Sequence, residues 1–223
     1  EESNDRNRGK GCYKKVIEAI EVIKENDIPL VIHATLTRDN MLDMEFLAEL
    51  AAAKKIRVQF SILYNCAELM DKSCETVMSN SEIKAIVRKI LVLKKKGFPI
   101  YYSNNVLQTA INWPFSDNEK LFIKEKDSFS KAHKFIPCYH GKLKFQIDAD
   151  GRVITCWAHN LKEAPNIRNL GVKQAIEQCR VDNRCKYCAF LANNEHNGLL
   201  HLSPRNIVNI LRIQIVDTFK IKT

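Results

Sequence analysis

The sequence predicts an α/β fold with a parallel sheet, followed by a smaller α+β part that contains a β-hairpin. Helical periodicity alternates three times with short apolar, β-branched runs over the first 103 residues. After residue 136 the periodicity changes to strict alternation around an Asp-Gly turn. The 223 residues are 45% hydrophobic and 27% charged, a composition that supports a core and excludes disordered and collagen-like chains.

Three helix-then-strand units are expected in series. We expect helices at residues 11–27, 43–55 and 82–96, and strands at residues 29–37, 56–64 and 98–103. Ser81 is the predicted N-cap of the third helix, and Gly97 is its predicted C-terminal stop. Units of this kind in series require parallel strands with right-handed crossovers, so polar residues that follow the strands should share one ligand-binding edge.

The charged and Ser-containing residues 116–136 indicate a linker between residues 1–115 and residues 137–223. In the second part, residues 142–148 and 152–157 alternate on either side of a turn, which predicts a hairpin. We expect a helix over residues 172–179, then a cysteine-bearing loop, and a final helix from Pro204.

Four of the eight cysteines form a spaced pattern, which we call the cysteine quartet: Cys138, Cys156, Cys185 and Cys188. The first two bracket the predicted hairpin, and the last two form a C-x2-C pair in a tight loop, so the four thiolates can converge on one metal centre. Spacing alone fits zinc and a [4Fe–4S] cluster equally. The remaining cysteines have no partner at ligand spacing and are interpreted as small buried apolar residues: Cys12, Cys66, Cys74 and Cys179.

The formal net charge of +9 raises nucleic acid as a partner, but the basic residues are dispersed over predicted helix faces. Nucleic acid is therefore not expected. The sequence shows no apolar run long enough for a membrane span and no secretory signal, so we expect a cytoplasmic protein that does not bind membranes.

The second part resembles the twitch domain, the single-cluster relative of the SPASM domain found at the C-terminus of radical S-adenosylmethionine (SAM) enzymes. The match comprises Cys138, twelve residues, Gly151, four residues, Cys156 and the later C-x2-C pair at Cys185 and Cys188. The stretch from Asn166 to Gly171 also resembles the segment that follows in the family. The resemblance implies one auxiliary [4Fe–4S] cluster held by the quartet.

The first 110 residues are similar to the second half of a radical SAM partial (β/α) barrel, related to the TIM barrel. Residues 4–13 resemble the entry to the fourth helix of that barrel. The CX3CX2C motif, which binds the catalytic cluster and SAM in this family, is absent from the sequence. We therefore expect a C-terminal portion of such an enzyme, which binds at most one cluster and does not cleave SAM by itself.

The resemblance implies an oxidoreductase-type reaction in which a 5′-deoxyadenosyl radical abstracts hydrogen from a small molecule or peptide. SAM, a second [4Fe–4S] cluster and an electron donor such as flavodoxin or ferredoxin are the implied partners of the longer enzyme. Contacts to SAM and substrate are expected from polar residues of the strands and strand ends: Thr35, Thr37, Arg38, Gln59, Ser61, Ser103 and Asn104.

Two other interpretations remain open at this stage. In the first interpretation, the chain is a zinc-binding α/β module whose four-cysteine ribbon docks on nucleic acid or on a protein partner. Alternatively, Cys185 and Cys188 cycle as a redox dithiol, which leaves Cys138 and Cys156 unexplained.

Overall fold

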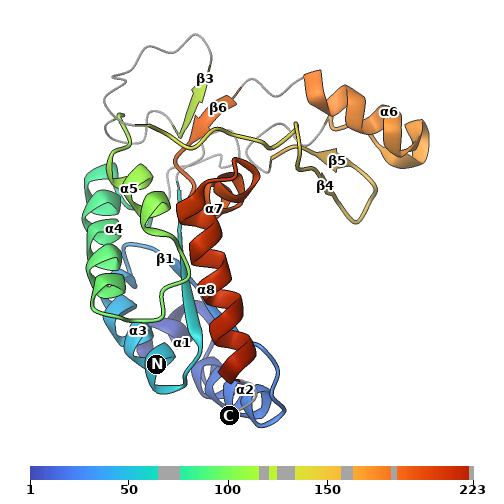
Figure 1. Ribbon diagram of the computed structural model, residues 1–223. Coiled ribbons are helices and arrows are strands. Elements are labelled where there is room, and N and C mark those ends of the chain that lie inside the picture. The colour runs from blue at the N-terminus through green and yellow to red at the C-terminus, as the bar shows by residue number, and fades with distance from the viewer. Residues whose placement is uncertain (65–75, 116–120, 125–133, 157–162, 182–184, 221–223) are drawn as a thin grey trace.

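The computed structural model describes residues 1–64, 76–115, 121–124, 134–156, 163–181 and 185–220, without the side chains of residues 181 and 214–220. It is a mixed α/β structure, as the sequence predicts (Figure 1). The first half contains α1 (Glu2–Arg8), α2 (Cys12–Glu25), β1 (Val31–Leu36), the 3-10 turn η1 (Met41–Asp43), α3 (Met44–Ala53), β2 (Arg57–Ile62), α4 (Asn80–Lys95) and α5 (Asn104–Ile111). The second half contains β3 (Phe122–Lys124), β4 (Gln146–Ile147), β5 (Val153–Ile154), α6 (Ile167–Val181), β6 (Cys185–Cys188), α7 (Leu191–Leu200) and α8 (Pro204–Lys220).

The parallel sheet is confirmed for the first two predicted strands, since β1 and β2 pair in parallel from Val31 with Arg57 to Leu36 with Ile62. The expected third strand is reduced to one parallel bridge between Val58 and Ile100. Val58 N donates to Pro99 O at 3.1 Å, and Tyr101 N donates to Val58 O at 3.0 Å. The described residues therefore form a small two-stranded parallel sheet, to which Ile100 adds one bridge. They do not form a barrel.

Alternation in β2 separates an apolar face from a polar face of this sheet. Val58, Phe60 and Ile62 are buried on one face, where β2 contacts α3. Helices α3, α4 and α5 lie on one side of the strands, and α8 lies on the other side (Figure 1). Successive side chains of a strand point to opposite faces, so a strand whose two faces are covered unequally has one apolar face and one polar face.

Helix α4 begins two residues earlier than the sequence predicts. The N-cap is Ser79, and the prediction of Ser81 is wrong. Ser79 Oγ accepts a hydrogen bond from Glu82 N at 3.3 Å, and Glu82 Oε2 accepts one from Ser79 N at 2.7 Å. These reciprocal bonds form a capping box, which satisfies two backbone donors and therefore outcompetes a cap at Ser81.

The segment interpreted as a linker contributes a strand to the second half. Within residues 116–136, β3 pairs antiparallel with β6, and the C-x2-C pair is therefore part of a strand. The prediction of a tight loop at this pair is wrong. The expected hairpin is confirmed by the antiparallel pairing of β4 with β5.

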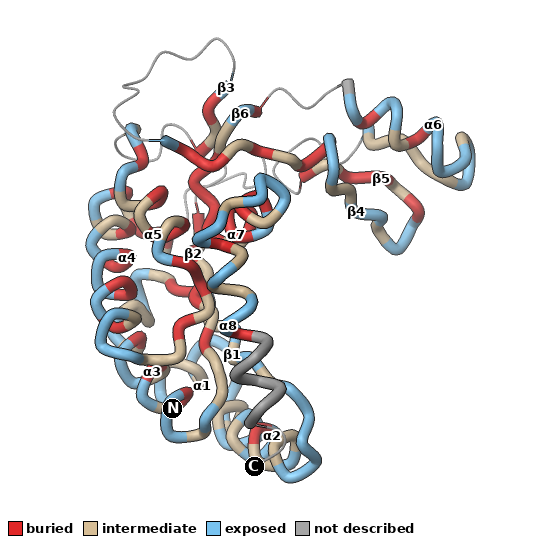
Figure 2. Tube along the Cα trace, in the orientation of Figure 1, coloured by how far each residue is buried: buried red, intermediate tan, exposed pale blue. Residues whose placement is uncertain are grey.

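The helices of the second half differ from the prediction at two places. The predicted helix 172–179 lies inside the longer α6, which is broken at Gly171. Helix α7 was not predicted, because its sequence LANNEHNGLL has five polar residues and no clear apolar periodicity. Those polar residues are nevertheless mostly buried (Figure 2), so their hydrogen bonds take the place of apolar contacts.

One apolar core runs through both halves of the chain. It includes Phe60, Ile90 and Leu107 from the first half, and Phe135 and Leu191 from the second. A separate small cluster, Val153, Ala175 and Cys179, joins β5 to α6, which project away from the rest of the molecule (Figure 1). No helix in the described part of the chain is both long and apolar enough to cross a membrane.

Candidate metal centre

The C-x2-C pair lies in a bulged strand, and the bulge determines where the two cysteines point. Phe122 pairs with Cys188 and Lys124 pairs with Cys185, with a register shift between them. Lys186 is thus the extra residue of β6. Since Phe122 and Lys124 are two residues apart, their partners lie on the same side of the ladder, and both cysteines are buried.

The other two cysteines of the quartet come from segments beside this strand. Cys138 N donates a hydrogen bond of 2.8 Å to the carbonyl of the bulge residue Lys186. Cys156 follows β5 and is buried, and its Sγ accepts a hydrogen bond of 3.8 Å from Asn193 Nδ2 of α7. The structure therefore brings all four predicted cysteines to one region.

The pKa of Cys188 depends on the other three thiols of the quartet. Burial raises the pKa of Cys188 well above its ordinary value, and the charges of Cys138, Cys156 and Cys185 raise it further. Burial also raises the pKa of Cys138, against the opposing effects of the His140 backbone N–H and the Asn197 side chain. Without a cation these raised pKa values keep the buried thiols protonated, and a bound cation would favour their thiolate forms by relieving the repulsion between the negative charges.

Helix α7 places three asparagine side chains next to the quartet. Asn193 Nδ2 contacts Cys156, and Asn194 Nδ2 donates to Cys188 O at 2.9 Å. Asn197 Oδ1 accepts from Tyr139 N at 2.9 Å, and the side chain of Asn197 lies close enough to Cys138 to lower the pKa of that thiol. Sequence reasoning missed these residues, although three asparagines within five positions, beginning five residues after Cys188, are a usable signal.

The quartet fits a sulfur-ligated metal in its chemistry. Its thiols are buried and come from three segments, and N–H groups of the kind that can hydrogen-bond a metal-bound sulfur lie next to Cys138 and Cys156. The side chains do not form a finished coordination sphere. Within the described ranges, no group of three or more His, Cys, Asp or Glu side chains is arranged closely enough to hold a metal ion.

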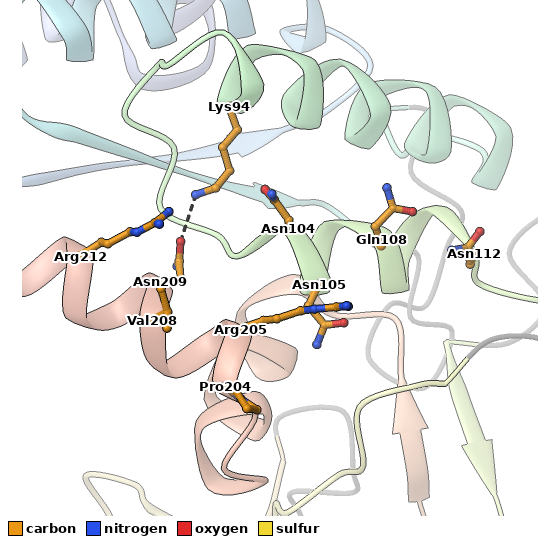
Figure 3. A pocket seen from close by; sticks show the side chains of 10 residues that line it. All are labelled: Lys94, Asn104, Asn105, Gln108, Asn112, Pro204, Arg205, Val208, Asn209 and Arg212. Atoms are coloured by element: carbon orange, nitrogen blue, oxygen red, sulfur yellow. Dashed lines mark hydrogen bonds between the residues drawn. The ribbon is translucent and has the colours of Figure 1, made fainter.

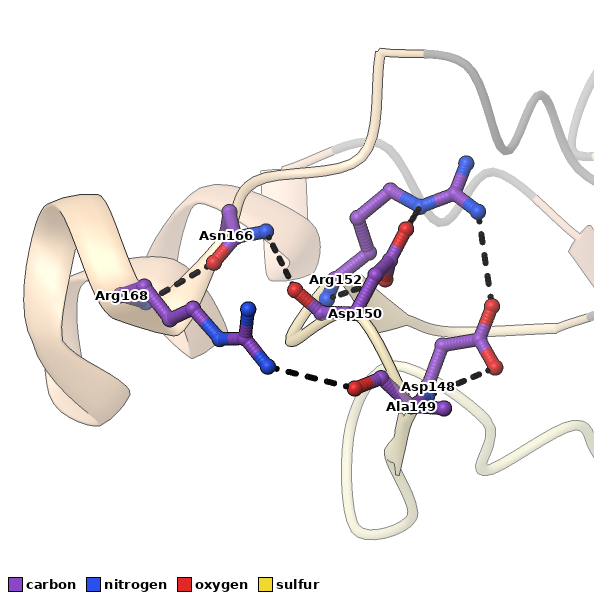
Figure 4. Close-up of polar contacts among 6 residues, drawn as sticks. All are labelled: Asp148, Ala149, Asp150, Arg152, Asn166 and Arg168. Carbon is purple, nitrogen blue, oxygen red and sulfur yellow. Dashed lines mark hydrogen bonds and ion pairs between the residues drawn. The ribbon is translucent and has the colours of Figure 1, made fainter.

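The turn of the hairpin is fixed to the start of α6 (Figure 4). Asn166 Nδ2 donates to Asp150 O at 3.0 Å, and Arg168 Nη2 donates to Ala149 O at 3.4 Å. Arg152 pairs with Asp150 through Nε at 2.6 Å. The stretch that resembles the twitch segment after the hairpin therefore supports the loop between the first two cysteines.

The quartet lies near the carboxyl ends of the parallel strands. Tyr64, which follows β2, donates a hydrogen bond of 3.1 Å to Ala189 O directly after Cys188. Its ring packs edge-on against Phe190, with centroids 4.7 Å apart. Burial and the charges of Tyr102 and Cys188 raise the pKa of Tyr64. This is the edge at which parallel α/β sheets bind ligands.

Three predicted contact residues share the polar face of the sheet. Thr35 and Ser61 are register partners, and Gln59 lies two residues before Ser61. Gln59 Nε2 donates to Tyr102 OH at 3.2 Å, and Ser61 Oγ shares a hydrogen bond of 2.5 Å with His33 Nε2. These groups form one polar surface, and their contact with SAM or substrate stays a prediction.

The other predicted contact residues lie in structural roles or elsewhere. Arg38 forms an ion pair with Glu82 at 3.1 Å, and Thr37 Oγ1 is buried without a hydrogen-bond partner among the described residues. Ser103 caps α5, since its Oγ accepts from Val106 N at 3.4 Å. Asn104 lines a cavity between α5 and α8.

A buried polar network that the sequence did not reveal joins the two halves. Glu195 of α7 is 1% exposed, and its carboxylate accepts hydrogen bonds from Ser103 N at 2.8 Å and Asn209 Nδ2 at 3.3 Å. Lys94 Nζ donates to Asn209 Oδ1 at 3.1 Å. Burial raises the pKa of Glu195, and burial lowers the pKa of Lys94 to about 8.

Two of the four cysteines outside the quartet lie within the described residues. Cys179 is buried in the small cluster and donates through Sγ to Val153 O at 3.0 Å, which agrees with its interpretation as a packing residue. Cys12 is half-buried in α2. Cys66 and Cys74 lie outside the described residues.

Comparison of the chain with protein-family models, with curated proteins and with solved structures returned no match.

Proposed function

We propose that the cysteine quartet holds one [4Fe–4S] cluster, with Cys138, Cys156, Cys185 and Cys188 as its ligands. The observation that carries the proposal is that two buried cysteines from other segments, Cys138 and Cys156, lie beside the two buried cysteines of the bulged strand β6. A cluster with four thiolate ligands has no iron open to substrate, which favours electron transfer or a structural role. When bound, the cluster would supply one-electron transfer at the carboxyl ends of the strands.

We further propose that the chain is the C-terminal portion of a radical SAM enzyme acting on an unidentified small molecule or peptide. Two observations support this proposal beyond the cysteine spacing. The sheet carries a polar face with Thr35, Gln59 and Ser61, and Tyr64 joins the carboxyl end of β2 to the residue after Cys188. A cluster held here would lie close to a substrate bound over the strand ends.

Metal and sulfide analysis tests the centre. The 223-residue chain would be purified anaerobically, reconstituted with iron and sulfide, and analysed for iron, acid-labile sulfide and zinc. The proposal expects about four iron and about four sulfide per chain. A variant with the four quartet cysteines changed to Ala should lose both, whereas Cys179→Ala, which removes an equally buried thiol outside the quartet, should retain them.

Zinc is the alternative ligand of a four-thiolate site. About one zinc per chain with no sulfide would contradict the iron–sulfur assignment and identify a structural zinc site. Binding to nucleic acid that weakens steeply with salt would then select the docking module. Single changes such as Cys156→Ser provide the same readout if the fourfold variant does not fold.

The enzyme class has its own test. The DNA upstream of the region that encodes residue 1 should encode a CX3CX2C motif in the same reading frame. If that sequence lacks the motif, the radical SAM assignment fails, while the metal content of the quartet is unaffected. The two parts of the proposal can therefore fail separately.

A further inference from the structure

A cavity of about 730 Å³ lies between α5, the end of α4 and α8 (Figure 3). It shares no residue with the cysteine quartet, and no sequence motif pointed to it. Its volume falls in the range of about 300 to 1,000 Å³ that is typical of small-molecule sites. It is lined by Lys94, Asn104, Asn105, Gln108, Asn112, Pro204, Arg205, Val208, Asn209 and Arg212.

The charge of this lining has one sign. Lys94, Arg205 and Arg212 are cationic, and none of the lining residues is acidic. Arg205 and Arg212 are exposed and form no hydrogen bond or ion pair with a residue that the structure describes, so their guanidinium groups are available to a ligand. Arginine presents its N–H groups in a fork that matches phosphate oxygens.

Lys94 is held in a fixed position at one end of the cavity. Its Nζ donates to Ile100 O at 2.9 Å and to Asn209 Oδ1 at 3.1 Å, and it reaches from α4 toward α8 (Figure 3). The carboxylate of Glu195 accepts from Asn209 Nδ2 at 3.3 Å and offsets one of the positive charges. About two positive charges remain, which matches the charge of a phosphate monoester near neutral pH.

The opposite wall of the cavity supplies neutral hydrogen-bonding groups. Asn104 and Gln108 are four residues apart on α5 and thus lie on one face of the helix. Asn105 Nδ2 donates to Asn206 Oδ1 at 3.3 Å, which ties this wall to α8. The described lining residues offer carboxamides for hydroxyl groups, and none of them has an aromatic ring on which a base could stack.

We propose that this cavity binds a small sugar phosphate, with Arg205 and Arg212 on the phosphate and the carboxamides of α5 on the sugar hydroxyls. Sugar phosphate and free phosphate share the anion chemistry, and the amide wall favours the sugar. The proposal does not rest on the identity of the centre at the cysteines.

Calorimetric titration of the whole chain tests this proposal. The probes are ribose 5-phosphate, inorganic phosphate and ribose, each at constant ionic strength. We expect saturable binding of one ribose 5-phosphate per chain, weaker binding of inorganic phosphate and none of ribose. Arg205→Gln and Arg212→Gln should each weaken ribose 5-phosphate binding about tenfold, since each removes a charge-assisted contact.

Matched variants separate this site from general surface charge. Arg88→Gln removes an exposed arginine of α4 that lies outside the cavity and should change binding less than twofold, within the usual range for a remote surface change. Gln108→Ala should weaken the sugar phosphate and leave inorganic phosphate unchanged. Val208→Glu, which places a carboxylate in the lining, should abolish the binding of both anions.

Four outcomes would overturn the proposal. These are the absence of saturable binding of any phosphate, equal losses in Arg88→Gln and the cavity variants, or inorganic phosphate binding as tightly as ribose 5-phosphate with no effect of Gln108→Ala. The fourth is binding of a single-stranded oligonucleotide with the same arginine dependence while ribose 5-phosphate does not bind. That result would assign the surface to nucleic acid. Thermal unfolding of each variant without ligand verifies that the fold is retained.

Discussion

At the scale of single residues, Gly151 combines two constraints that few positions share. Its φ of 90° lies in the left-handed region, and a Cβ at this position would stand 2.9 Å from Asn166 Oδ1. Asn166 cannot retreat freely, because it also bonds to Asp150 O and Arg168 N. The glycine therefore permits both the turn of the hairpin and the attachment of the turn to α6.

We predict that Gly151→Ala lowers the free energy of unfolding by about 3 kcal/mol, through left-handed backbone strain plus the overlap with Asn166. Gly97→Ala is the matched control, since Gly97 has a φ of 94° and nothing within 4 Å of an added Cβ. It should lose about 1 kcal/mol. Urea denaturation measures both, and equal losses would show that the contact with Asn166 contributes nothing.

Two carboxyl groups respond to pH in opposite directions. Burial raises the pKa of Glu195, so ionising it in the folded protein is unfavourable. Hydrogen bonds from Arg38 and from Ser79 lower the pKa of Glu82 to about 2, so its ionised form is favoured. The stability contributed by Glu195 is present below the ordinary pKa of a glutamate and is lost as pH rises, whereas that of Glu82 is lost as pH falls from about 4.5 toward about 2.

We predict that the difference in the free energy of unfolding between the unchanged protein and each glutamine variant changes with pH. Relative to Glu195→Gln, the unchanged protein should lose stability as pH rises from about 4.5 through the raised pKa of Glu195. Relative to Glu82→Gln, it should lose stability as pH falls below about 4.5. Denaturant unfolding at a series of pH values gives both differences. A difference for Glu195→Gln that stays constant with pH would show that this carboxyl does not titrate differently in the two states.

At the scale of elements, the start of helix α4 shows why the sequence predicts the N-cap two residues too late. Ser79 and Ser81 both precede the apolar periodicity, and either hydroxyl suits an N-cap. The distinguishing feature is Glu82, which stands at the third helical position after Ser79 and completes the capping box. The spacing of three between cap and glutamate is therefore the more informative signal.

We predict that Ser79→Ala lowers the free energy of unfolding by about 1 kcal/mol, because it removes the side-chain acceptor for Glu82 N. Ser81→Ala serves as the control in the same helix and should change stability by less than about 0.5 kcal/mol. Thermal unfolding followed by circular dichroism measures the two changes. A larger loss at Ser81 would restore it as the functional cap.

Elements with regular apolar periodicity were predictable from sequence, and elements held by polar contacts were not. The apolar strands β1 and β2 lie inside their predicted ranges. Helix α7 was missed because its buried face consists of asparagines and Glu195, whose partners come from distant segments such as Ser103 and Tyr139. No local rule reveals that such residues are buried, since each needs its hydrogen-bond partner in place first.

At the scale of the whole molecule, the core does not follow the predicted division at residues 116–136. Residues from both predicted parts belong to one apolar cluster, and β3 within the proposed linker pairs with β6. The hairpin and α6 are the exception, because their small cluster of Val153, Ala175 and Cys179 is separate. Stability should therefore divide between this projecting unit and the rest.

Hydrogen exchange of backbone amides tests that division. We predict that the amides of Val153 and Ile167, which bond within the projecting unit, exchange at least about tenfold faster than those of Val58 and Tyr101 in the sheet. The expectation follows from the few apolar contacts that hold the hairpin and α6. Equal protection of both sets would show that the molecule opens as a single unit.

For the candidate metal centre, the sequence predicted which cysteines lie in one region, but it did not predict the residues around them. The spacing of the cysteines was sufficient to select Cys138, Cys156, Cys185 and Cys188, which the structure brings to one region. The expected polar contacts divided differently: Gln59 and Ser61 share the sheet's polar face, whereas Arg38 is occupied by Glu82. All three side chains already have protein partners, Tyr102, His33 and Glu82, and which partner a polar residue finds depends on side chains far away in sequence.

The bulge at Lys186 changes what a C-x2-C pair requires of the chain around it. In a regular strand, residues three apart face opposite sides, so the two thiols could not serve one centre. Here the register set by Phe122 and Lys124 returns Cys185 and Cys188 to the same side. The placement of both thiols on one side therefore depends partly on a three-residue strand far upstream, which the spacing of the cysteines alone does not reveal.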